Sequence, residues 1–335
     1  MKANLIRRIA IAVCLLSCIT IYSCKKDVSA SGDTSTANVS TTGDDVQQVS
    51  NESELINNDA NTALNGQAAF SGSSISALQT GTVAVDGEQE NVAVSGLIDS
   101  HHLICDATVT YDTANNQRVI TIVYDGTKCW GNRTRTGTIV ITMPVSQHWK
   151  DVGATATVNI QALKITRLRD NKSIVLNGTK TIVNVSGGLL KDLAGLQTIT
   201  HTINGSLKID FNNGTSRTWN VSKQRVFTYD NGIVITTTGT YSDGTNNNIA
   251  EWGTDRFGDS FTSLISAPKV IRQDCDYRLV SGQNTVILSK GIAVITYGLD
   301  SNGDPTGCPG LDGTYYFKLV YTANNGKVYT IIWPY

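Results

Sequence analysis

From about residue 105 onward, apolar residues occupy every second position of the chain. Runs of this kind include Ala107–Tyr111, Ile139–Met143, Ala154–Ile160, Leu207–Phe211 and Tyr315–Tyr321, in which mostly polar residues fill the intervening positions. Successive side chains of a β-strand point to opposite faces, so this alternation predicts strands with one buried face. The pattern therefore predicts an all-β body over residues 105–335.

Glycine-containing dipeptides punctuate these runs. Asn-Gly or Asp-Gly occurs at residues 177–178, 204–205, 213–214, 231–232, 243–244 and 325–326. Such pairs tolerate the positive φ angles of tight hairpins, and connections this short leave no room for crossover helices. We expect an antiparallel meander of roughly 14–16 strands. It would form a sandwich or a strongly curved half-barrel, with a single-layer sheet as the alternative.

The N-terminal part of the chain lacks this alternation. Residues 1–23 combine a basic start with a short apolar run, which is typical of a signal peptide. Residues 24–50 are rich in Ser, Thr, Asp, Val and Gly without periodicity, and we expect a flexible tether there. Residues 51–104 form an N-terminal segment in which one short helix over 51–66 is possible.

The apolar run ends at Ser23-Cys24, and polar Lys25, Lys26 and Asp27 follow. A small residue, a cysteine and then polar residues resemble the lipobox of bacterial lipoproteins, which implies that Cys24 carries the lipid anchor. Cys18 is a second possible anchor, and an ordinary secretory leader is the alternative. We therefore expect a chain bound to the membrane by lipid in the cell envelope. The expected membrane is the outer one, with the periplasmic and surface faces both open.

Four cysteines lie beyond the leader: Cys105, Cys129, Cys275 and Cys308. An even number in an exported chain indicates two disulfides, for which three pairings are open. Two segments, 105–143 and 275–321, share an order of features. Each begins with Cys-Asp, passes through a strand ending in Tyr, and reaches its second Cys before a Gly-Thr strand. This internal repeat favours one disulfide within each segment, Cys105–Cys129 and Cys275–Cys308.

The first repeat and the lipobox carry a family resemblance. The motifs are Cys105-Asp-Ala-Thr-Val-Thr-Tyr, Arg118-Val-Ile-Thr-Ile and Gly131-Asn-Arg-Thr-Arg-Thr-Gly-Thr-Ile, with Cys129 before the last. They resemble a group of exported Bacteroidota lipoproteins over about residues 50–335. The resemblance implies an address in the envelope and a β-rich fold, and it implies no activity.

Composition and motifs exclude several partners. The chain has 27 basic and 28 acidic residues, so it lacks the basic surplus that nucleic-acid binding requires. No Gly-rich phosphate loop or other cofactor motif is present, and we expect no cofactor. His201 alternates with Ile199 and Ile203, which predicts a core or edge histidine rather than a ligand.

Ionisable and aromatic residues are densest around residues 251–259. The candidate ligand contacts there are Glu251, Trp252, Asp255 and Arg256. An exposed tryptophan can stack on a sugar, and two neighbouring carboxylates would allow acid–base attack on a glycosidic bond. The alternative is a polar connection between strands, in which Trp252 packs inward and Arg256 pairs with an aspartate.

Asp300, Asn302 and Asp304 place oxygen ligands at alternate positions, as the first half of a calcium loop does. Pro305 and Leu311 stand where an EF-hand needs Gly and Glu, and Asp, Asn and Gly are ordinary turn residues. We therefore expect no metal, with this loop as a weak candidate site.

No Ser-His-Asp, Cys-His or zinc-protease pattern is present, so we expect no enzyme. The leading hypothesis is a non-enzymatic envelope lipoprotein that binds or presents a glycan or an envelope protein. The second is a structural or scaffold lipoprotein without a small ligand, and the third is an accessory glycan hydrolase. An exposed aromatic cleft would favour the first, and paired carboxylates in a groove would favour the third.

Overall fold

The computed structural model describes most of the chain from Thr34 onward. The described residues are 34–73, 81–85, 88–92, 104–129, 133–168, 170–196, 198–275, 277–308 and 313–335. The chain divides into two compact units, residues 1–38 and 39–335. Of the first unit, only the start of helix α2 falls within the described residues.

Strands make up most of the second unit. A separate antiparallel pair consists of β1 (Gly81–Val85) and β2 (Glu88–Val92). The other strands are β3 (Ala107–Ala114), β4 (Gln117–Asp125), β5 (Arg133–Pro144), β6 (Ala154–Arg167), β7 (Ser173–Asn184), β8 (Ile199–Phe211), β9 (Ser216–Tyr229), β10 (Ile233–Gly239), β11 (Ile249–Thr254), β12 (Ser260–Arg272), β13 (Arg278–Leu288), β14 (Gly291–Leu299), β15 (Tyr316–Ala323) and β16 (Val328–Pro334). The helices are α2 (Thr34–Asn65) and α3 (Ala68–Ser71), with short 3-10 helices η2 (Leu190–Gly195) and η3 (Gln273–Cys275).

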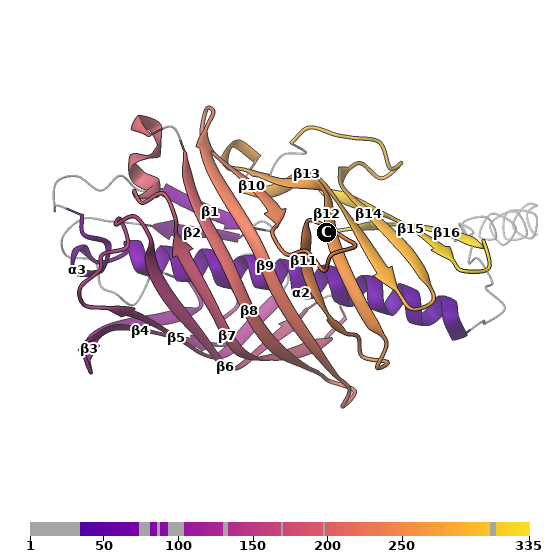
Figure 1. Cartoon of the computed structure of the whole chain (residues 1–335), viewed down its shortest axis with the longest axis horizontal. Coiled ribbons are helices and arrows are strands. Elements are labelled where there is room, and N and C mark those ends of the chain that lie inside the picture. The colour runs from indigo at the N-terminus through magenta and orange to yellow at the C-terminus, as the bar shows by residue number, and fades with distance from the viewer. Residues whose placement is uncertain are drawn as a thin grey trace, which may run out of the picture. The chain divides into compact units, whose positions relative to one another are not determined.

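Strands β3 to β16 form one 14-stranded sheet in which every pairing is antiparallel. Neighbours follow chain order except between β9 and β12. There β10 and β11 share one position, because both strands pair with β9 and with β12. The prediction of an all-β antiparallel meander is confirmed. The sheet is continuous and curves around α2, as Figure 1 shows, which is the half-barrel form.

The predicted tight turns are only partly correct. Residues 213–214, 231–232, 243–244 and 325–326 lie between consecutive strands, as expected. Residues 177–178 and 204–205 instead lie inside β7 and β8, so the prediction is wrong there. A Cβ atom on Gly178 would come within 2.3 Å of the Ser206 carbonyl oxygen on the neighbouring strand. Gly178 therefore permits a close approach of two strands rather than a turn.

Helix α2 occupies much of the predicted tether. The expectation of a flexible tether over residues 24–50 is wrong from Thr34 onward, because α2 runs from there to Asn65. Asn, Ser and Thr, which favour helices weakly, dominate its sequence. From Thr42 onward its side chains are almost all buried. Packing against the sheet, rather than intrinsic propensity, therefore stabilises this helix. The short helix predicted over 51–66 is its C-terminal half.

The concave side of the sheet encloses α2 within the second unit (Figure 1). Val46, Val49, Ile56 and Leu64 of the helix belong to one hydrophobic core with the inward side chains of the strands. On the β15 side, a Cβ atom at Gly43 would lie 2.5 Å from Leu319 Cδ1, so the helix leaves no room for a side chain there. Within the described part of the chain, no helix combines the length and apolarity needed to cross a membrane.

Candidate functional site

The four predicted ligand contacts lie in or directly after β11, but they do not form one site. Glu251 points to the concave side, where its Oε1 accepts a hydrogen bond from Ser50 Oγ of α2 at 3.0 Å. Only 1% of Glu251 is exposed. Trp252 is its direct neighbour on the strand and therefore faces the outer side. Trp252 is half-buried and stays a candidate contact, whereas Glu251 is too deeply buried to reach a ligand on the outer side.

Asp255 and Arg256 also turn toward α2. Asp255 Oδ2 accepts a hydrogen bond from Thr42 Oγ1 at 3.0 Å. Its Oδ1 accepts from the backbone nitrogens of Phe257 and Asp259, which orders the turn before β12. Arg256 pairs with an aspartate, as the alternative reading proposed, but this partner is Asp45 of the helix. The two carboxylates among the predicted contacts, Glu251 and Asp255, are thus buried against α2.

The acidic residues of α2 all pair with basic residues of the sheet unit. The pairs are Asp44 with Arg167 and Lys172, Asp45 with Arg256, Glu52 with Arg133, Glu54 with Lys223 and Arg225, and Asp59 with Arg135. The helix sequence contains no lysine or arginine. An acidic helix therefore lies against a basic inner face.

Lys223 of β9 lies at the centre of this interface. Its Nζ is 3.1 Å from Glu54 Oε1 and 2.6 Å from Glu251 Oε1, and all three side chains are nearly inaccessible to solvent. Burial alone would raise the pKa of Glu54, but the charges of Lys223 and Arg225 outweigh it and lower that pKa to about 2. Both carboxylates therefore stay ionised and share one ammonium group.

Two further lysines meet serines of the helix. Lys180 Nζ donates to Ser53 Oγ at 2.5 Å, and Lys269 Nζ donates to Ser50 Oγ at 3.2 Å. Burial lowers the pKa of Lys180 to about 7 and that of Lys269 to about 8. A lysine of lowered pKa beside a serine hydroxyl is a known way to activate a nucleophile. Ser53 and Lys180 are both fully buried, however, so this pair has no access to a substrate.

The outer face of the sheet carries an aromatic pair beside a hollow. Trp252 stacks on Tyr241, with ring centroids 4.3 Å apart and planes inclined by 16°. The adjacent hollow has a volume of about 560 Å³. Its lining consists of Asn177, Gly178, Ser206, Leu207, Lys208, Ser216, Arg217, Thr218 and Thr254. Four of these residues, Ser206, Lys208, Ser216 and Thr218, are polar and exposed, whereas Leu207 and Arg217 are buried.

The hollow and Trp252 lie near each other along β9 and β11. Thr254 lies two residues after Trp252 on the same face, and its Oγ1 is 2.7 Å from Thr218 Oγ1. Asn220, two residues after Thr218, donates from Nδ2 to the Trp252 carbonyl oxygen at 3.2 Å. Thr218 and Thr254 of the hollow are therefore followed, on the same face of their strands, by Asn220 and Trp252.

A smaller hollow of about 290 Å³ opens where β6, β16 and α2 meet. Its lining is Thr41, Asp44, Arg167, Asp170, Lys172, Trp333 and Pro334. Arg167 donates to both Asp44 and Asp170, at distances from 2.6 to 3.0 Å. These charges already satisfy one another, so the larger hollow is the better ligand site.

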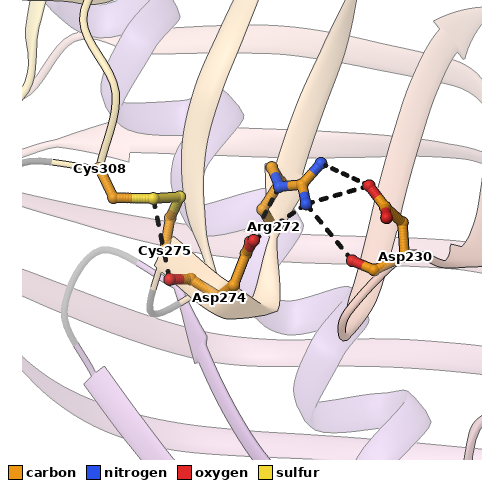
Figure 2. The surroundings of a disulfide bond; sticks show 5 residues. All are labelled: Asp230, Arg272, Asp274, Cys275 and Cys308. Atoms are coloured by element: carbon orange, nitrogen blue, oxygen red, sulfur yellow. Dashed lines mark hydrogen bonds and ion pairs between the residues drawn. A yellow bond between two sulfur atoms is a disulfide. The ribbon is translucent and has the colours of Figure 1, made fainter.

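The disulfides join the cysteines that the internal repeat paired. They are Cys105–Cys129 and Cys275–Cys308, with Cα–Cα distances of 6.0 and 5.2 Å. Figure 2 shows the second bond beside Arg272, which binds Asp274 and the neighbouring Asp230. This disulfide fastens the loop after β14 to η3, which follows β12 directly.

The candidate calcium loop uses its first carboxylate for its own backbone. Asp300 Oδ1 accepts hydrogen bonds from the backbone nitrogens of Asn302 and Asp304 at 2.8 and 3.0 Å. These bonds lower the pKa of Asp300. Across the described residues, no three potential metal-ligating side chains gather into a group. The arrangement is that of an ordinary turn.

Cys24 and Cys18, the candidate lipid anchors, lie outside the described residues. His201 is a core residue, packed between Trp149 and Phe227 with centroid distances of 5.1 and 4.8 Å, so its assignment to the core or an edge is confirmed.

The sequence analysis did not identify the acidic residues of α2 as buried partners of the sheet. Asp45, Glu52 and Asp59 are spaced seven residues apart. On a helix, residues spaced seven apart lie on one face. This spacing is the sequence pattern that could have indicated a helix with a charged face. The low helix propensity around these residues concealed it.

Comparisons of the chain with protein-family models, with curated proteins and with solved structures found no match.

Proposed function

We propose that this chain is a non-enzymatic, lipid-anchored protein of the cell envelope that binds a glycan on the outer face of its sheet. The observation that carries the proposal is the stacked pair Tyr241–Trp252, whose tryptophan lies two residues before Thr254 of a hydroxyl-lined hollow on β11. Tyr241 is 40% exposed. An exposed aromatic ring offers an apolar surface to the C–H groups of a sugar.

The lining of the hollow suits the rest of a sugar ring. Ser206, Ser216, Thr218 and Thr254 supply hydroxyl groups, each of which can donate and accept hydrogen bonds. Lys208 adds a charged edge and pairs with an aspartate of β8 at 2.9 Å. A few placed polar groups beside an apolar surface are the usual make-up of a small-molecule site. A neutral or weakly acidic oligosaccharide fits this chemistry best.

The membrane part of the proposal rests on the leader pattern and the lipobox around Cys24. The two disulfides support an exported chain, because such bonds persist in oxidising compartments. We propose the outer membrane as the site of anchoring. The non-enzymatic part is supported by the burial of Glu251 and Asp255, the carboxylates nearest to Trp252 in sequence.

Loss of either ring of the aromatic pair should weaken glycan binding. We expect the chain from Asp27 onward to bind some members of an immobilised oligosaccharide array. Tyr241→Ala and Trp252→Ala should each weaken binding of the best array member by about tenfold, because stacking contributes on the order of 1 kcal/mol or more. Calorimetric titration with that oligosaccharide measures the change.

Tyr229→Ala is the matched control. Tyr229 is also an exposed tyrosine of the sheet but lies at the far end of β9 from the hollow, and its loss should leave the affinity unchanged. If the chain binds no oligosaccharide on the array, the glycan proposal is refuted. So would an affinity that survives the loss of both Tyr241 and Trp252.

A further inference from the structure

We infer that the outer face of the four C-terminal strands, β13 to β16, docks on the surface of a bilayer that contains anionic phospholipids. This docking deepens the proposed lipid anchoring and rests on it, because the anchor brings the bilayer to these strands. It is independent of glycan binding, since the residues that line the larger hollow lie on β7, β8, β9 and β11.

The outer face of β13 to β16 is rich in aliphatic side chains. By contrast, the outward positions of β8 are polar from Thr200 to Asp210. In β13 to β15, core residues such as Val286, Ala293 and Leu319 mark the inward positions, so their neighbours along each strand point outward. The outward aliphatic residues of the four strands are Ile287, Ile292, Val294, Val320, Val328 and Ile332.

Strand register brings these side chains together. Ile292 lies between Ile287 and Thr322 of the neighbouring strands. Val328 lies on the other side of Thr322. Directly opposed residues of an antiparallel pair have Cβ atoms about 5 Å apart, so the row is contiguous. Ile292 is 45% exposed and Val328 is 58% exposed. A contiguous exposed apolar patch of this kind marks an interaction surface.

The charge of these strands is positive. Residues 278–299 and 313–335 contain one arginine and three lysines, and they contain no aspartate or glutamate. Lys290 and Lys327 are exposed in the hairpin turns at one border of the aliphatic patch. Lys290 also contacts Asp259 of a neighbouring turn at 3.5 Å. Exposed lysines beside aliphatic side chains are the combination that binds an anionic membrane surface.

The chain enters the second unit close to these strands. A Cβ atom at Gly43 would lie 2.5 Å from Leu319 Cδ1 of β15. Thr41 lines the smaller hollow together with Trp333 of β16. The chain between Cys24 and Thr41 spans at most about 60 Å when fully extended. A lipid on Cys24 therefore holds β15 and β16 within that distance of the bilayer, where even a weak contact is populated because the effective concentration is high.

A stable pair of chains needs a larger surface than this patch. Four strands spaced about 4.8 Å apart, with about three outward rows of side chains, give an area of roughly 300–400 Å². A stable protein–protein interface buries about 800 Å² on each partner. A bilayer sets no such minimum, because the lipid anchor already holds the chain at its surface. The size of the patch therefore favours a bilayer over a second copy of the chain.

The test uses the chain from Asp27 onward, which lacks the lipid but contains the whole second unit, and vesicles of phosphatidylglycerol and phosphatidylcholine. We expect this lipid-free chain to sediment with the vesicles, and added salt should weaken the binding. Ile292→Asp combined with Val328→Asp should weaken it at least about tenfold, because charges replace two exposed aliphatic side chains. Val123→Asp is the matched control. Val123 is 44% exposed on the outer face of β4, and its replacement should leave vesicle binding unchanged.

The lysines provide a second variant that leaves the aliphatic patch intact. Lys290→Gln combined with Lys327→Gln should weaken binding to the same vesicles at least about fivefold. Lys150→Gln, which changes an exposed lysine between β5 and β6, should not weaken it. The lysine variant decides the question if the double aspartate variant loses its β-sheet circular dichroism.

Docking is overturned if the lipid-free chain does not bind the vesicles, or if both double variants bind them as well as wild type. It is also overturned if the chain ignores vesicles and instead dimerises through this face. Mass spectrometry of the membrane-extracted protein tests acylation of Cys24 separately. An acylated chain whose lipid-free form ignores vesicles overturns docking alone, whereas vesicle binding by a chain with unmodified Cys24 overturns anchoring alone.

Discussion

Replacing Lys223 with methionine should lower the free energy of unfolding by about 3–5 kcal/mol, the usual cost of breaking a buried ion pair from one side. The methionine leaves Glu54 and Glu251 facing each other without the ammonium group that lies 3.1 and 2.6 Å from them. Neither carboxylate can turn to solvent, since both are buried. Chemical unfolding with the disulfides intact measures the change.

Two further variants separate the charge from the loss of packing. Lys223→Met combined with Glu251→Gln removes one of the stranded carboxylates and should recover part of the loss. Lys208→Met breaks the exposed pair with Asp210 and should cost at most about 1 kcal/mol. A Lys223→Met chain that is no less stable than the Lys208→Met chain would contradict the charge arrangement described for the interface between α2 and the sheet.

His201→Phe should make the protein more resistant to acid. Burial, with a smaller contribution from Arg225, lowers the pKa of His201 to about 3. A histidine in the unfolded chain has a pKa near 6.5. Between about pH 6.5 and 3 the unfolded state therefore binds a proton at His201 that the folded state does not bind. Stability is therefore lost as the pH falls from about 6.5 toward 3, by up to about 4–5 kcal/mol. Phenylalanine keeps the contacts with Trp149 and Phe227 and removes this loss.

Unfolding midpoints of wild type and His201→Phe at pH 8, 7, 5 and 4 make the comparison. Above pH 7 the two chains should differ by a constant amount. Below pH 6.5 the variant should gain on wild type by about 3 kcal/mol by pH 4. Parallel curves over the whole range would contradict this prediction, because they would mean that His201 has the same pKa in the folded and unfolded states.

The sheet was predictable because its signals are local. Alternation such as that of Leu207, Ile209 and Phe211 reports a buried strand face directly, and the order of Cys275 and Cys308 in the repeat reported the disulfide. The turns at 177–178 and 204–205 were wrong because Asn-Gly also serves where two strands come close, as at Gly178. Local sequence does not distinguish these two uses of glycine.

The helix was not predictable from propensity. Its stability comes from contacts with residues far along the chain, such as Asp45 with Arg256 and Ser50 with Glu251. The same contacts explain why Glu251, Asp255 and Arg256 looked like an exposed ligand site. Their partners lie in residues 42–50, where the sequence predicts a tether. The ionic and hydrogen-bond partners of these side chains therefore cannot be recognised from the local sequence. Trp252 remains a candidate ligand contact because the alternation of side chains along β11 directs it away from the helix.

Hydrogen exchange of the backbone amides between Val46 and Leu64 is the most direct measurement. If these residues form a helix enclosed by the sheet, their amides should exchange at least about 100-fold more slowly than those of an unfolded chain at neutral pH. Exchange at unprotected rates, with the strands still protected, would contradict the account by returning the segment to a tether.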